Sequence, residues 1–153
     1  MLFSIILGIV ISACTTATAA TIPSLADSAF QLVVGASASH NYLAGLSISL
    51  DSEKQLILTG DATKFQQKNP TVLVPVGNDT STSTQIVVRP DGSLVVGDAN
   101  EQNYEKFSVN FDSNGVMLIN ESNFGVVSCS RKLKYFQSSG DFGSCTPVII
   151  KRQ

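Results

Sequence analysis

The stretch that decides the fold is 84–98, which reads TQIVVRPDGSLVVGD. The β-branched run 86–88 suits a pleated, half-buried strand, and a second aliphatic run follows at 94–96. Between the two runs, Pro90 fixes its own φ and Gly92 can take a positive φ without steric cost. Aliphatic runs that flank a Gly-containing turn predict a β-hairpin.

Similar short runs recur along the rest of the chain. Segments 46–50 and 107–111 alternate apolar and polar residues, which is typical of a strand with one buried face. No window has sustained helical periodicity. We therefore predict one all-β domain over 30–153, with about a dozen short antiparallel strands, after a linker-like lead at 21–29. The remaining expected strands are 30–34, 55–59, 71–76, 116–119, 125–128, 133–136 and 147–150.

The chain contains a weak internal repeat. LILTGDA at 56–62 resembles LVVGDA at 94–99, and VVSC at 126–129 is a poorer third copy. Three units of about forty residues, each with several short strands, suit a β-trefoil. A closed arrangement of this kind would also remove unpaired sheet edges. We prefer a β-trefoil-like fold, with a two-sheet β-sandwich as the alternative.

Residues 1–20 differ in composition from the rest and predict a secretory signal peptide. The apolar segment 2–13 is too short to span a bilayer comfortably, and the small-residue pattern Ala17-Thr18-Ala19 follows it. A rival interpretation is a bacterial lipobox at 11–14, with Cys14 as the lipidated residue. The expected mature chain is secreted, to the medium or the cell wall, and has no transmembrane segment.

Once Cys14 is removed with the signal, Cys129 and Cys145 remain. Two cysteines in a secreted domain most simply form one disulfide, which over so short a loop stabilises by about 3 kcal/mol. We expect no metal site, because two thiols without a nearby histidine are too few ligands for zinc.

Two sequons predict N-glycosylation at the surface, at Asn78 and Asn120. The dibasic pair Lys151-Arg152 is either a processing site or an exposed charged terminus, and both interpretations remain open.

The composition excludes several functions. Charged residues make up 14% of the chain and the net charge is −2, which argues against nucleic-acid binding. The chain has no nucleophile-elbow, zinc-protease or P-loop motif, and most carboxylates fall in turns, so we expect neither an enzyme nor a cofactor. The best candidate ligand contacts are His40 and Tyr42, in a loop of small residues. The alternative for Tyr42 is partial packing in the core with its hydroxyl at the surface.

Three segments resemble PhiA-type fungal cell wall proteins. Residues 30–60, FQLVVGASASHNYLAGLSISLDSEKQLILTG, resemble the start of that family's mature domain, with its F-x-L-x-S opening, its Ala/Ser-rich segment and a strand pair ending in Gly. QIVVRPDGSL at 85–94 resembles the family's hairpin, and 123–129 with 135–137 resembles a later segment. The chain departs from the family in having fewer cysteines and shorter loops, so the family's disulfide pattern does not carry over.

The resemblance implies a small secreted glycoprotein of the fungal cell wall or culture fluid, with no known catalytic residues. It also disfavours the lipobox, because the family is eukaryotic. We therefore expect a non-enzymatic, cell-wall-associated glycoprotein. The alternative is a lectin-like or effector-like module that recognises a glycan, such as a cell-wall polysaccharide, or a host protein. A hydrolase is the least favoured function.

Overall fold

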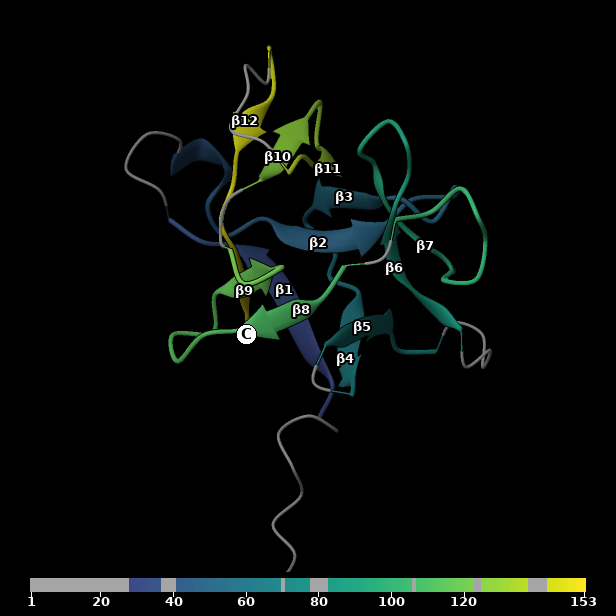
Figure 1. Cartoon of the computed structure of the whole chain (residues 1–153). Helices are drawn as coiled ribbons and strands as arrows, with labels where there is room; N and C mark the ends of the chain where they lie inside the picture. The colour runs from purple at the N-terminus through teal and green to yellow at the C-terminus, as the bar shows by residue number, and fades with distance from the viewer. Residues whose placement is uncertain are drawn as a thin grey trace, which may run out of the picture.

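The computed structural model describes residues 28–36, 41–69, 71–77, 83–105, 107–122, 125–137 and 143–153. Within these ranges the chain is all-β, as predicted, with thirteen short strands, all paired antiparallel, and one 3-10 turn (Figure 1). The predicted signal peptide at 1–20, the lead up to residue 27, His40 and Asn78 lie outside the described residues.

Most of the predicted strands are confirmed, with their ends moved by one or two residues. The expected last strand, 147–150, is divided between β12 and β13, which pair with different partners. The strands are β1 (Phe30–Val34), β2 (Ser47–Leu50), β3 (Leu56–Thr59), β4 (Lys64–Lys68), β5 (Val72–Pro75), β6 (Thr84–Val88), β7 (Leu94–Asp98), β8 (Val109–Phe111), β9 (Met117–Ile119), β10 (Val126–Cys129), β11 (Lys132–Tyr135), β12 (Thr146–Pro147) and β13 (Ile150–Arg152), and the 3-10 turn is η2 (Asn41–Leu43).

Strand β4 was not predicted from the sequence. It reads KFQQK, and its polar residues hide the strand because Phe65 is its only apolar side chain. Phe65 is nevertheless fully buried. Its backbone lies opposite Phe30 of β1 on one side and Pro75 of β5 on the other. Neighbouring strands, and not local propensity, therefore make this segment a strand.

Three hairpins share the same five-residue turn, at 51–55, 89–93 and 112–116. In each turn, the first residue's N–H donates to the fifth residue's carbonyl, and the fourth residue's N–H donates to the first residue's carbonyl. The fourth residue has a positive φ in all three: 60° at Lys54, 83° at Gly92 and 76° at Gly115. The positive φ predicted for Gly92 is thus confirmed.

Two single backbone contacts link four pairs of strands into a closed series. Strand β1 pairs with β13 and β4, and β4 pairs with β5. A backbone hydrogen bond of 2.9 Å from Val109 at the start of β8 reaches Thr71, just before β5. Strand β8 pairs with β9, and a bridge between Val116 and Lys151 returns from the β9 segment to β13. The order β13-β1-β4-β5-β8-β9 therefore closes on itself.

A second arrangement is triangular. Strands β3, β7 and β11 are each the second strand of a hairpin, and they begin at residues 56, 94 and 132, that is, 38 residues apart. They meet pairwise through bridges that join Gln55 to Val95, Ser93 to Lys134 and Lys132 to Ile57. The third copy of the repeat is therefore β11, and not segment 126–129, which is the first strand of its hairpin.

The hairpin β6–β7 is buried on both faces. Ile86, Val88, Leu94 and Val96 belong to the main core, whereas Val87 and Val95 form a second cluster with Ala99, against which Tyr104 packs. Burial on both faces explains why this hairpin has continuous aliphatic runs in place of alternation.

The predicted disulfide is present between Cys129 and Cys145, whose Cα atoms are 4.4 Å apart. Directly beside it, Ser128 of β10 pairs with Thr146 of β12. The bond therefore fastens the chain where it enters the last two strands, as the sequence suggested.

Candidate functional site

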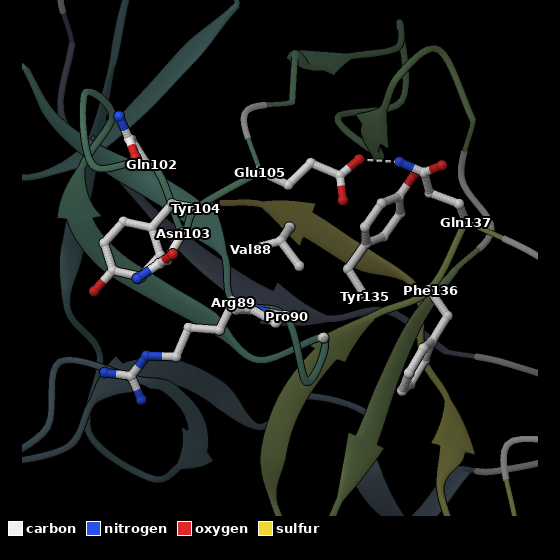
Figure 2. A pocket seen from close by; sticks show the side chains of 11 residues that line it. Val88, Arg89, Pro90, Gln102, Asn103, Tyr104, Glu105, Tyr135, Phe136 and Gln137 are labelled. Carbon is white, nitrogen blue, oxygen red and sulfur yellow. Dashed lines mark hydrogen bonds between the residues drawn. The ribbon is translucent and has the colours of Figure 1, made fainter.

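A cleft of about 430 Å³ is the candidate site. Three segments that are distant in sequence enclose it: the end of β6 with its turn (88–92), the loop 102–105, and the end of β11 with the residues after it (135–137) (Figure 2).

Backbone hydrogen bonds fix these three segments relative to one another. Val88 and Glu105 exchange two bonds, of 3.0 and 2.9 Å, which hold the loop against β6. The N–H of Tyr135 donates to the carbonyl of Gly92 over 2.8 Å, which holds β11 against the hairpin turn. The walls of the cleft are therefore fixed by main-chain bonds.

The apolar part of the cleft is formed by Val88 and Tyr135, which are 4% and 7% exposed. The Tyr135 ring stacks on Phe107 with centroids 6.0 Å apart. Its hydroxyl accepts a long hydrogen bond, 3.5 Å, from the side-chain amide of Asn120. Packing and this bond together fix the position of the ring.

Two further aromatic rings occupy space that glycines leave open. A Cβ atom added at Gly97 would lie 2.7 Å from Cε2 of Tyr104, so this ring rests directly on the strand. A Cβ added at Gly92 would lie 3.0 Å from Cε1 of Phe136. The two glycines thus allow Tyr104 and Phe136 to line the cleft.

Apart from Arg89, the charged and amide side chains of the lining are exposed. Gln102 and Asn103 come from the loop, and the side-chain amide of Gln137 donates a hydrogen bond to the carboxylate of Glu105. Figure 2 shows the half-buried Arg89 extending away from Glu105. Of the described residues that line the cleft, Glu105 is the one carboxylate and Arg89 is the one cationic side chain.

The hairpin turn beside the cleft is held by Asp91. Burial tends to raise the pKa of its carboxyl group, but hydrogen bonds from the N–H and hydroxyl of Ser93, at 3.0 and 2.9 Å, outweigh this. The ammonium of Lys134 on β11, 3.6 Å away, acts in the same direction. The net effect lowers the pKa of Asp91 below its ordinary value.

The predicted ligand residues do not contribute to the cleft as far as the structure describes them. His40 lies outside the described residues. Tyr42 is 72% exposed, so it does not pack in the core, and its hydroxyl lies 3.1 Å from the hydroxyl of Thr146. The neighbouring Leu43, 6% exposed, enters the core instead.

The predicted glycosylation site Asn120 is exposed at a turn, and its side-chain oxygen Oδ1 accepts a 3.1 Å hydrogen bond from the N–H of Ser108. Lys151 and Arg152 are residues of β13 that pair with β1, and both are half-buried. The dibasic pair is therefore part of the sheet, and processing there would require β13 to separate from β1.

Sequence reasoning missed most of the cleft. The turn residues Pro90 and Gly92 stood out through their backbone chemistry. The loop residues and Gln137 carry no motif, and the pairing of Val88 with Glu105 and of Gly92 with Tyr135 is what brings them to one site.

Comparisons with protein-family models, curated proteins and solved structures gave no match for this chain. No helix among the described residues is long and apolar enough to cross a membrane. Over the same residues, no three His, Cys, Asp or Glu side chains gather as a metal site would require.

Proposed function

We propose that this protein is a secreted, non-enzymatic glycoprotein associated with a cell wall of fungal type. The observation that carries the proposal is the Cys129–Cys145 disulfide in a small all-β domain. Disulfides persist in oxidising compartments and stabilise small secreted domains. The signal-like segment 1–20, the sequons and the resemblance to PhiA-type proteins support the same destination.

We also propose that the fold is of the β-trefoil type. The closed series of β13, β1, β4, β5, β8 and β9 and the triangle formed by β3, β7 and β11 support it, since a trefoil consists of a closed barrel and a threefold set of hairpins. The regular interval of 38 residues between the strands of the triangle is further support. A two-sheet sandwich, the alternative, would not require the bridge that closes the triangle between Ser93 and Lys134.

Cell fractionation tests the proposed location. An antibody against the chain should detect it in the culture medium and in the detergent-washed wall fraction of the producing cells. Its mass there should match a chain that has lost residues 1–20 and gained N-glycans. A purely cytosolic pool of the full-length chain would contradict the proposal.

A second candidate function, a lectin-like binding module, is favoured by the cleft, because amide and aromatic side chains line it. Recognition of a host protein, the effector-like form of this candidate, has no comparable support. Hydrolysis ranks last. A glycosidase of the usual type needs two carboxyl groups that face each other, and Glu105 is the one carboxylate among the described residues of the lining.

A further inference from the structure

We propose that the cleft between the β6–β7 turn, the loop 102–105 and residues 135–137 binds an uncharged saccharide. The inference rests on the second candidate function and names its site and its ligand class. It does not depend on where the protein is located, so fractionation and binding experiments can fail independently.

The charge of the lining argues for an uncharged ligand. Among the lining residues that the structure describes, Glu105 contributes a negative group, Arg89 contributes a positive group, and the other side chains are neutral. The Glu105 carboxylate also accepts a bond from Gln137. The carboxylate of Glu105 would repel an acidic ligand, and the guanidinium of Arg89 would repel a basic ligand, so neither sign of charge is favoured.

The hydrogen-bonding groups match hydroxyl groups. Gln102, Asn103 and Gln137 each carry a side-chain amide that both donates and accepts. A sugar hydroxyl also donates and accepts, so each pair can form bonds in both directions. All three side chains are exposed and can therefore reach a ligand at the mouth of the cleft.

The aromatic groups match the apolar side of a sugar ring. Tyr104 and Phe136 line the cleft, and each is half-buried. The C–H groups on one face of a pyranose can pack against such rings while its hydroxyls point to the amides. The cleft's volume of about 430 Å³ also lies within the range of about 300–1,000 Å³ that is usual for small-ligand sites.

The backbone argues against an extended peptide as the ligand. A peptide that adds to a sheet edge needs open N–H and carbonyl groups. At this cleft, Val88 and Glu105 satisfy each other in both directions, and the N–H of Tyr135 is bonded to Gly92. Side chains must therefore provide the contacts that recognise the ligand, as they do in saccharide binding.

NMR titration of the full mature chain, labelled with ¹⁵N, tests the inference. The probes are uncharged trisaccharides of glucose, mannose and N-acetylglucosamine, with trigalacturonate as a charged probe of equal length. We expect at least one uncharged trisaccharide to shift the side-chain amide signals of Gln102, Asn103 and Gln137. We expect trigalacturonate to bind at least tenfold more weakly.

Two variants locate the site. Asn103→Ala and Gln137→Ala each remove a hydrogen-bonding amide from an exposed position, which should weaken binding about 3- to 10-fold. Tyr42→Ala removes a highly exposed side chain that is not part of the cleft lining and should leave affinity unchanged. A thermal melt of each variant ensures that only folded protein is compared.

Three results would overturn the inference. The first is the absence of any shift with each uncharged trisaccharide at a ligand concentration of about 10 mM. Even a marginal ligand, with a millimolar dissociation constant, would bind at this concentration. The second is preferential binding of trigalacturonate. The third is loss of binding in Tyr42→Ala with full affinity in Asn103→Ala and Gln137→Ala, which would place the ligand at the 3-10 turn.

Discussion

Replacing Gly92 by alanine should destabilise the protein much more than the same change at Gly45. The two glycines have almost the same φ, 83° at Gly92 and 82° at Gly45. A Cβ at Gly45 meets no atom within 4 Å, whereas a Cβ at Gly92 lies 3.1 Å from the carbonyl oxygen of Tyr135 and 3.0 Å from the ring of Phe136. The pair therefore separates the effect of positive φ from the effect of crowding.

The positive φ alone costs alanine about 1–2 kcal/mol, and this applies to both variants. Crowding at Gly92 adds about 1–3 kcal/mol, as is usual when a methyl group enters a packed site. The turn cannot move aside freely, because the carbonyl of Gly92 accepts the N–H of Tyr135. Relief of the crowding would weaken this bond between the hairpin and β11.

Urea denaturation measures both variants against the parent protein. We expect Gly92→Ala to lose about 1–3 kcal/mol more unfolding free energy than Gly45→Ala, which corresponds to a further drop of roughly 4–12 °C in melting temperature. Equal losses, within about 0.5 kcal/mol, would refute the reasoning.

The equivalent turn at 51–55 provides a converse test. Lys54 occupies the position of Gly92, at a φ of 60°, and is exposed. Lys54→Gly should therefore keep or slightly raise stability, by up to about 1 kcal/mol. A clear loss of stability would mean that positive φ is not the strain that operates in these turns.

Three further predictions concern charge, covalent structure and glycosylation. Because the pKa of Asp91 is lowered in the folded state, its ionised form adds stability that is complete above its ordinary pKa of 3.8 and is lost as pH falls through the folded pKa. Urea denaturation should therefore show that Asp91→Ala is less stable than the parent at pH 7, by under about 1 kcal/mol for so exposed a group, and that this difference shrinks at pH 3. A difference that is the same at both pH values would contradict the assignment. Cys145→Ser should lower the unfolding free energy by about 3 kcal/mol, the value expected for a crosslink that spans 16 residues, while the circular dichroism of the sheet persists. Two reactive thiols in a titration of the denatured, unreduced parent would exclude the bond. Treatment of the secreted protein with an N-glycosidase should lower its apparent mass, and Asn120→Gln should remove part of that shift, because Asn120 is exposed at a turn; an unchanged shift in Asn120→Gln would show that this site is unused.

Much of the fold could be predicted from short-range patterns. The hairpin 84–98, the positive φ at Gly92 and the all-β class follow from β-branched runs and turn residues, whose preferences act over a few neighbours. The Cys129–Cys145 bond could be predicted because few alternatives exist for two cysteines.

Where the same short-range patterns were absent, prediction failed. Strand β4 has Phe65 as its one apolar residue, so no pattern predicts it. For the third copy of the repeat, VVSC of β10 resembles the earlier copies more than KLKY of β11 does, so the sequence favours the wrong strand. In both cases pairing with distant strands decides the structure. Lys132 at the start of β11 faces Ile57 of β3, a contact that composition does not reveal.

The sequence by itself determined most of the strands, the turns and the crosslink, because each of these depends on residues that are adjacent or few in number. Only the tertiary structure decided the candidate site. Glu105 and Gln137 are 32 residues apart in the chain and are brought together by the pairing of Val88 with Glu105 and of Gly92 with Tyr135. Side-chain periodicity tells which face of a strand is buried, but not which strand it will face. The cleft exists only because these two pairings form at once.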